Sequence, residues 1–195
     1  EYAVYLAGGL IAWNYISAVI SEGATMVIDY AGQLRGIRLP LTVIAARVVY
    51  RNMIILMHNM VVGIATVYIA GFTITAKFLW LAPGLLVLWL FGICVAIALA
   101  PICTRFRDLP EIVRNGLQLM FFLTPIFWMA GQAGRRTAFV TGNPFNALID
   151  LVRVPVINGE YHPNMTITLG ITFLIVIILA FISIISTRNK LYNWL

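Results

Sequence analysis

Charge is what this sequence has least of. Only 10% of its 195 residues are charged, whereas 62% are hydrophobic. Soluble domains carry charge on about a quarter of their residues. A soluble chain of this length could not bury so much apolar surface, so a soluble globular protein is excluded. We expect lipid to be the solvent for much of the chain.

Cysteine and histidine are also rare, with two of each. Cys94 and Cys103 belong to one apolar run with no histidine nearby, which argues against a disulfide framework and against a metal site. The Gly-x4-Gly-Lys-Ser/Thr loop, the His-Glu-x-x-His motif and the Gly-x-Ser-x-Gly motif are all missing. The chain therefore has no P-loop for ATP and no recognisable catalytic centre, and we expect no cofactor within it.

Long apolar runs dominate what is present. About 20 apolar residues cross the hydrocarbon core of a bilayer, so the runs predict about five transmembrane helices in one all-α membrane domain, residues 1–195. The expected spans are residues 2–30, 41–71, 79–102, 110–130 and 165–185. Gly84, Gly92 and Ala96 should let the third span approach its neighbours closely. Pro125 should kink the fourth span near its outer end.

Residues 131–164 are polar at both ends and apolar in the middle. The middle is too short to span a bilayer, and it carries Asp150 and Arg153 three positions apart, where they could pair on one helical face. We therefore expect one or two short helices in this region, re-entrant or lying at the membrane interface, on the external side.

The positive charges indicate an orientation. The formal net charge is +6, and Lys and Arg gather near alternate ends of the spans, as they do in cytoplasmic loops. Nine lie on one side and four on the other, which predicts an external start, a cytoplasmic C-terminus and no nucleic-acid partner. The nine are Arg35, Arg38, Arg47, Arg51, Arg105, Arg107, Arg114, Arg188 and Lys190. The turns at residues 31–40 and 105–108 should then lie at the same cytoplasmic face.

Several charged side chains are expected within the first two spans. Arg47, Arg51 and His58 fall on one face of the second span, and a hairpin would bring Glu22 level with the two arginines. An unpaired charge at this depth is costly, so we predict that Glu22 pairs with Arg47 or Arg51. The set of four forms either a buried structural charge cluster or a basic lining for an anionic substrate.

Aromatic residues make up 12% of the chain. Most are expected in interface belts and in packing, but sugar rings also stack on aromatic side chains. Five aromatics are candidates for the lining of a glycan path, with packing as the alternative for each. They are Tyr5, Trp13, Phe121, Phe122 and Trp128.

Short motifs in a fixed order give the sequence a family resemblance. They are LAGGLIAW at 6–13, Pro40, RFRDL at 105–109, TPIFW at 124–128, NPFN at 143–146 followed by Arg153, and YNW at 192–194. With this order and spacing, the chain resembles the membrane permease of ABC type-2 exporters. The resemblance is to the polysaccharide branch, which exports O-antigen, capsule and teichoic-acid chains.

The resemblance implies a homodimer in the bacterial inner membrane with a channel at the subunit interface. Two separate ATPase subunits, which hold ATP and Mg, would dock on the cytoplasmic face, and a lipid-linked glycan would be threaded outward. The turns implied to face the ATPase contain Gln33, Leu34, Arg35, Arg38, Arg105, Arg107 and Asp108. The implied external gate contains Asn143, Pro144, Asp150 and Arg153. The family begins with an amphipathic interface helix and a further span that this sequence lacks, so we expect the chain to be part of a longer protein.

Two other functions stay open. One is an ABC type-2 exporter of drugs or small lipids. The other is an integral-membrane enzyme, such as a lipid-modifying transferase. An enzyme of this kind would need His, Asp or Glu clustered near one interface, whereas His58 and His162 lie on opposite sides in the predicted topology.

Overall fold

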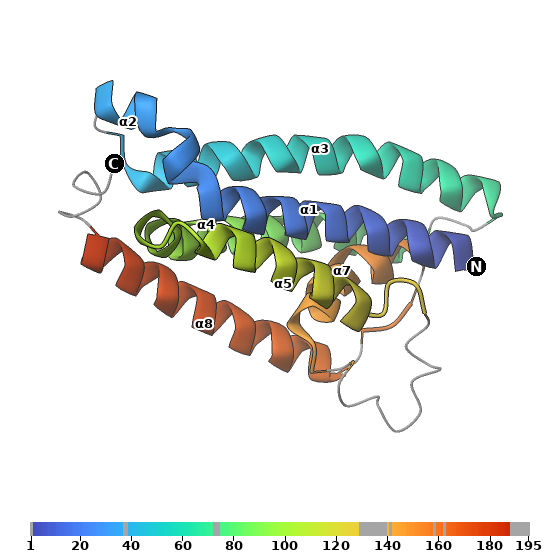
Figure 1. The fold of residues 1–195 in the computed structure, drawn as a ribbon. Helices are drawn as coiled ribbons and strands as arrows, with labels where there is room; N and C mark the ends of the chain where they lie inside the picture. The colour runs from blue at the N-terminus through green and yellow to red at the C-terminus, as the bar shows by residue number, and fades with distance from the viewer. Residues whose placement is uncertain are drawn as a thin grey trace.

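The described part of the chain is entirely helical in its regular structure, which confirms the all-α class (Figure 1). The computed structural model describes residues 2–36, 39–71, 75–128, 140, 142–157, 159–161 and 163–187. In chain order the elements are α1 (Tyr2–Asp29), α2 (Ala31–Gly36), α3 (Leu41–Ile69), the 3-10 helix η1 (Ala76–Trp80), α4 (Leu81–Arg105), α5 (Leu109–Leu123), α7 (Pro144–Val156) and α8 (Pro163–Thr187).

Four stretches of helix in the described residues are long and apolar enough to cross a membrane. They are Tyr2–Asp29, Leu41–Ile69, Ala76–Arg105 and Asn164–Ser186. The expected span at 110–130 differs from these, because α5 has 15 residues and is therefore only about 22 Å long at the α-helical rise. The hydrocarbon core is about 30 Å thick, so α5 by itself is short of a full span.

Pro125 explains why α5 is short. A residue that precedes proline is pushed away from the helical region, and Thr124 has an extended backbone with ψ 139°. The helix therefore ends at Leu123 instead of continuing through a kink, so the predicted kink was wrong.

The turn expected at residues 31–40 also differs, since its first six residues form α2.

Helix α1 lies at the centre of the bundle and contacts α3, α4, α5 and α7 (Figure 1). Small residues set its distance to α4, as predicted for that helix. A Cβ added to Gly23 would lie 2.8 Å from the Cα of Ala96, and one added to Gly92 would lie 3.1 Å from the Tyr15 hydroxyl. The Tyr15 hydroxyl donates to the carbonyl of Leu88 at 3.2 Å. Close packing and hydrogen bonding therefore fix the α1–α4 pair.

The bundle has two distinct ends (Figure 1). At one end lie α2, the corner between α4 and α5, and the last turn of α8; we name it the α2 end. At the other lie the start of α1, the end of α3, and α7; we name it the α7 end. The two corners expected to share a membrane face, residues 31–36 and 105–108, thus lie at the same end of the molecule.

Replacing Gly23 by Leu should destabilise the bundle, because the new side chain must displace the backbone of α4. Overpacking of this kind costs about 1–3 kcal/mol, so the midpoint of thermal unfolding in detergent should fall by several degrees. Gly170→Leu on α8 is the matched control, since no atom lies within 4 Å of a Cβ added there. Equal midpoints for the two variants would contradict the close α1–α4 contact.

Candidate functional site

Helix α7 begins with a well-formed N-terminal cap. The Asn143 side-chain oxygen accepts from the backbone N–H of Phe145 at 2.9 Å, and Pro144 occupies the first helical turn, where its missing N–H costs nothing. Ten of the 13 residues of α7 are buried, in contact with α1, α4, α8 and η1. The helix is thus packed into the α7 end of the bundle, more deeply than a helix lying at the membrane interface would be.

A buried arginine lies on the inner side of α7. Arg153 is only 3% exposed, and its guanidinium contacts the Asp150 carboxylate through Nε, at 2.9 Å, and through Nη2. Nη2 also donates to the side-chain oxygen of Asn146 at 3.0 Å, and Asn146 donates to Asp150 at 3.0 Å. The predicted Asp150–Arg153 pair is therefore confirmed. Asn146 was not predicted, although positions 146, 150 and 153 share one helical face.

Arg153 also connects α7 to two other parts of the chain. Its Nη1 donates to the carbonyl of Pro125 at 2.8 Å, just beyond the end of α5. Its guanidinium carbon lies 4.1 Å from the ring centroid of Tyr5 on α1, and the Tyr5 hydroxyl donates to the same Pro125 carbonyl at 2.9 Å. We name Tyr5, Pro125, Asn146, Asp150 and Arg153 the Arg153 cluster. It joins α1, α5 and α7 at one point.

Burial is the main influence on the Asp150 carboxyl in this cluster. Burial raises the pKa of the Asp150 carboxyl, while the Arg153 guanidinium and the Asn146 amide act to lower it. Removing two charges from water costs several kcal/mol for each ion, and only close contact and further hydrogen bonds offset that cost. The cluster is therefore better understood as a fixed joint than as a large source of stability.

Two further hydrogen bonds hold residues 124–128 at this joint. The Asn143 amide donates to the Thr124 hydroxyl at 3.2 Å, and the Tyr2 hydroxyl donates to the carbonyl of Phe127 at 2.7 Å. The segment after α5 is thus attached both to α7 and to the start of α1.

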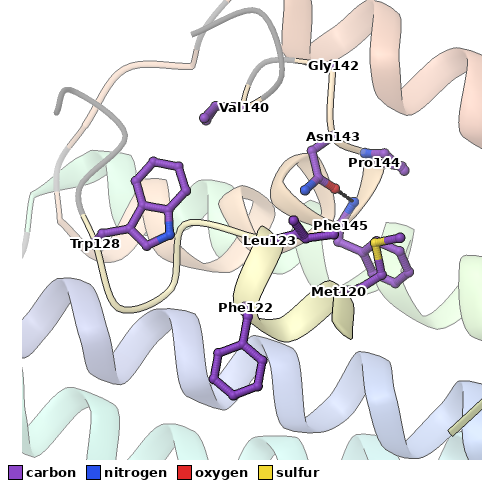
Figure 2. A pocket seen from close by; sticks show the side chains of 9 residues that line it. All are labelled: Met120, Phe122, Leu123, Trp128, Val140, Gly142, Asn143, Pro144 and Phe145. Carbon is purple, nitrogen blue, oxygen red and sulfur yellow. Dashed lines mark hydrogen bonds between the residues drawn. The ribbon is translucent and has the colours of Figure 1, made fainter. Parts of the chain in front are cut away.

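An open hollow of about 710 Å³ lies beside this segment, between the end of α5 and the start of α7 (Figure 2). It brings two predicted path residues, Phe122 and Trp128, together with two predicted gate residues, Asn143 and Pro144. Figure 2 shows the Asn143 side chain turned back to the backbone of Phe145, and Phe122 pointing away from Asn143. The full lining is Met120, Phe122, Leu123, Trp128, Val140, Gly142, Asn143, Pro144 and Phe145.

The other predicted path residues are buried or half-buried, and two of them, Trp13 and Phe121, also line a second hollow between α1 and α5 that is described below. Trp13 is 6% exposed, and its ring centroid is 5.4 Å from that of Phe121 and 5.6 Å from that of Phe145. Tyr5 lies against Arg153 in the cluster described above. Within a single chain Trp13 and Tyr5 are therefore packed between α1, α5 and α7, and a role in a glycan path stays a prediction.

A second hollow, of about 360 Å³, lies between α1 and α5 nearer the α2 end. Its polar lining consists of Ser17 and Ser21 from α1 with Arg114 and Gln118 from α5. The outward face of α5 adds further exposed polar groups, among them Asn115. Polar side chains at membrane depth need water or another polar surface, but α5 also exposes the apolar side chains of Ile112, Leu119 and Leu123.

The charged residues of α1 and α3 form pairs at the α2 end. Arg51 Nη2 lies 2.6 Å from the Glu22 carboxylate, as predicted for one of the two arginines. Asn52 Nδ2 donates to the same carboxylate at 2.5 Å. Arg47 instead donates to Gln33 at 3.2 Å, and its guanidinium carbon lies 5.1 Å from the Tyr30 ring centroid.

This set is less buried than the sequence predicts. The Arg51 and Glu22 side chains are 56% and 35% exposed, and Arg47 and His58 are exposed as well. The reason is that α3 packs against α1 and α4 on one side only, so the rim of this contact stays at the surface of the chain. The buried polar residue beside this set is Asn52, which is 4% exposed. The sequence signal for it was its position on the same helical face as Asn59, seven residues later in α3.

The residues implied to face an ATPase divide into buried and exposed ones. Leu34 is 1% exposed and packs with Met26, Ala45 and Val48 in the bundle, because it is the apolar side of the short helix α2. Gln33, Arg105, Arg107 and Asp108 are exposed at the α2 end. The Arg35 side chain and Arg38 lie outside the described residues.

Arg153→Met should destabilise the fold strongly, because it leaves the Asp150 carboxylate buried without its partner. Breaking a buried ion pair on one side costs about 3–5 kcal/mol, whereas replacing both charges is far better tolerated. We therefore expect the thermal midpoint in detergent to fall for Arg153→Met and to recover largely in the D150N/R153M double variant.

The control for this experiment is Arg114→Met. It breaks the exposed Arg114–Glu111 contact, which is 3.7 Å long. Loss of an exposed pair of this kind should lower the free energy of unfolding by at most about 1 kcal/mol. If Arg153→Met unfolded no earlier than this control, the Arg153 cluster would not be the joint described here.

Comparison with known proteins gives three similar curated sequences, each named "O-antigen export system permease protein RfbA". The chain is 29% identical over 132 residues to that of Myxococcus xanthus, covering 66% of the chain and 49% of the relative. It is 26% identical over 176 residues to one from Klebsiella pneumoniae, covering 86% of the chain and 67% of the relative. A second protein of that name from Klebsiella pneumoniae is 26% identical over 169 residues, covering 83% of the chain and 64% of the relative.

No family model matches the chain, and the chain spans from about half to two thirds of the length of these relatives. Together with the four apolar helices, the similarity describes a multi-pass membrane protein. The resemblance suggested by the sequence motifs is thus confirmed: over most of its length, the chain is similar to the permease proteins of O-antigen export systems.

Proposed function

We propose that this chain is the membrane permease of an ABC type-2 exporter that moves a lipid-linked polysaccharide outward across the bacterial inner membrane. The observation that carries the proposal is its similarity to three O-antigen export permeases, which extends over as much as 86% of the chain. The energy for transport comes from a partner, because the sequence has no P-loop.

The α2 end is the surface on which two ATPase subunits dock. Helix α2 and the α4–α5 corner lie at this end (Figure 1), and they expose Gln33, Arg105, Arg107 and Asp108. Under the positive-inside rule this end faces the cytoplasm, where ATP and Mg are available to the ATPase. Helix α2 continues directly from α1 after Tyr30, so a push on α2 is transmitted to the central helix of the bundle.

The α1–α5 face is the side on which two copies of the chain meet and enclose the glycan path. Ser17, Ser21, Arg114 and Gln118 give this face hydrogen-bonding groups for sugar hydroxyls. The hollow at the α7 end carries the path outward past Phe122 and Trp128, whose rings suit the C–H faces of sugars. Helix α7, locked by the Arg153 cluster, borders this outlet.

Docking of the ATPase is tested by affinity purification of the full protein from its native membrane. We expect a P-loop ATPase to be recovered in stoichiometric amount. R105A/R107A should reduce this recovery about tenfold, because it removes two exposed positive charges from the α2 end. The matched control T75E/A76E changes the net charge equally at the α7 end and should leave recovery unchanged. Equal recovery with both variants would contradict docking at the α2 end.

The path is tested by narrowing it. Ser21→Trp adds a large ring to the hollow between α1 and α5, so surface polysaccharide should fall at least about tenfold in cells that depend on this permease, as measured by lectin binding. ATPase recovery should not change. Ile175→Trp, on an exposed apolar position of α8, is the control and should export normally. Normal export with Ser21→Trp would place the path elsewhere.

A further inference from the structure

A second groove lies at the α7 end, on the side of the molecule formed by η1, α4, α7 and α8. It consists of a hollow of about 370 Å³ and one of about 230 Å³, and both are lined by Trp80 and Tyr161. The two hollows adjoin at these side chains, and we name them together the Trp80–Tyr161 groove. It has no residue in common with the hollows assigned to the glycan path.

The groove changes character along its length. The hollow nearer the chain connections contains two opposite charges, Lys77 and Glu160. The other hollow is lined mostly by apolar side chains. These include Val87, Leu151, Met165 and Leu169. Lys77 Nζ donates to the carbonyl of Gly159 at 3.4 Å. Gly159 directly precedes Glu160, so this bond holds the Lys77 ammonium near that part of the chain.

The position of the groove relative to the membrane follows from its walls. Residues 76–105 and 164–186 form two of the four candidate spans, and the groove begins where both of them begin. Trp80 and Tyr161 are 63% and 39% exposed, as is common for Trp and Tyr at the boundary between headgroups and hydrocarbon. The charged hollow therefore lies at headgroup level, and the apolar hollow extends from it into the bilayer.

The floor of the apolar hollow is formed by a close backbone contact. A Cβ added to Gly84 would lie 2.6 Å from the carbonyl oxygen of Leu151, so α4 and α7 touch there without an intervening side chain. Val87 and Leu169 line the hollow beside this contact.

We propose that the Trp80–Tyr161 groove binds one phospholipid with a zwitterionic, primary-amine headgroup. Its phosphate contacts the Lys77 ammonium, its own ammonium contacts the Glu160 carboxylate, and one acyl chain lies along the apolar hollow. The argument is charge complementarity: the groove presents one cation and one anion, and such a headgroup carries the matching anion and cation. A choline headgroup cannot donate hydrogen bonds to Glu160, and a glycerol headgroup has no cation for it.

This inference does not depend on the proposed transport function, since the groove is a separate surface and its ligand is a component of the bilayer. It is tested on the full chain, purified in detergent, by native mass spectrometry. Phosphatidylethanolamine, phosphatidylglycerol and phosphatidylcholine with identical acyl chains are added in equal amounts. We expect one phosphatidylethanolamine to be retained with at least about fivefold higher occupancy than either of the other lipids.

Variants separate the headgroup contacts from the acyl-chain contact. Lys77→Gln and Glu160→Gln should each abolish the preference, and Glu160→Lys should transfer it to phosphatidylglycerol, because two cations then face the headgroup. Thr166→Trp, which fills the apolar hollow from an exposed position on α8, should remove the retained lipid. The control Ile178→Trp adds the same ring to the exposed apolar face of α8 and should leave retention unchanged.

Several results would overturn the proposal. Equal retention of the three lipids would show that the charged hollow does not select a headgroup. Unchanged retention in Thr166→Trp would place the lipid elsewhere. Release of a second copy of the chain when lipid is added would identify the groove as a protein interface.

Discussion

The contact between the Arg153 guanidinium and the Pro125 carbonyl is the interaction on which this structure most depends. Pro125 ends α5 early and leaves the following backbone without helical partners, which a membrane environment cannot hydrate. A cation on α7 donates to that backbone, and Tyr5 on α1 donates to the same oxygen. One buried charge thereby completes the end of one helix, positions a second and attaches both to the central helix.

The rest of the interior meets the same requirement, that every buried polar group has a hydrogen-bond partner. No buried side-chain nitrogen or oxygen in the described residues lacks a hydrogen-bond partner. The hydroxyls of Tyr15 and Ser183 donate to carbonyls of α4, and Asn52 donates to Glu22 and to the carbonyl of Val48. Between these polar contacts, glycine and alanine let the helices approach closely. Since lipid gives apolar helices little reason to associate, such close packing and hydrogen bonding must hold the bundle together.

The two ends of the bundle serve different purposes in the proposed exporter. The α2 end exposes the charged corner between α4 and α5, which suits the docking of another subunit. The α7 end is instead cross-linked by the Arg153 cluster and by the bonds to residues 124–128, which suits a rigid outlet. A lipid bound in the Trp80–Tyr161 groove, as proposed, would contact α7 through residues other than those that line the proposed glycan path.

The sequence by itself determined the membrane class, the long apolar helices, the Glu22 and Asp150 ion pairs and the family resemblance. All of these follow from composition and from spacing along one helix or one hairpin. Only the tertiary structure decided that Trp13 packs in the interior, that Leu34 faces the bundle and that Arg153 bonds to the backbone of Pro125. These contacts join residues far apart in the chain, some of them across more than 100 positions. Helical periodicity tells which residues share a face, but it does not tell which other helix covers that face.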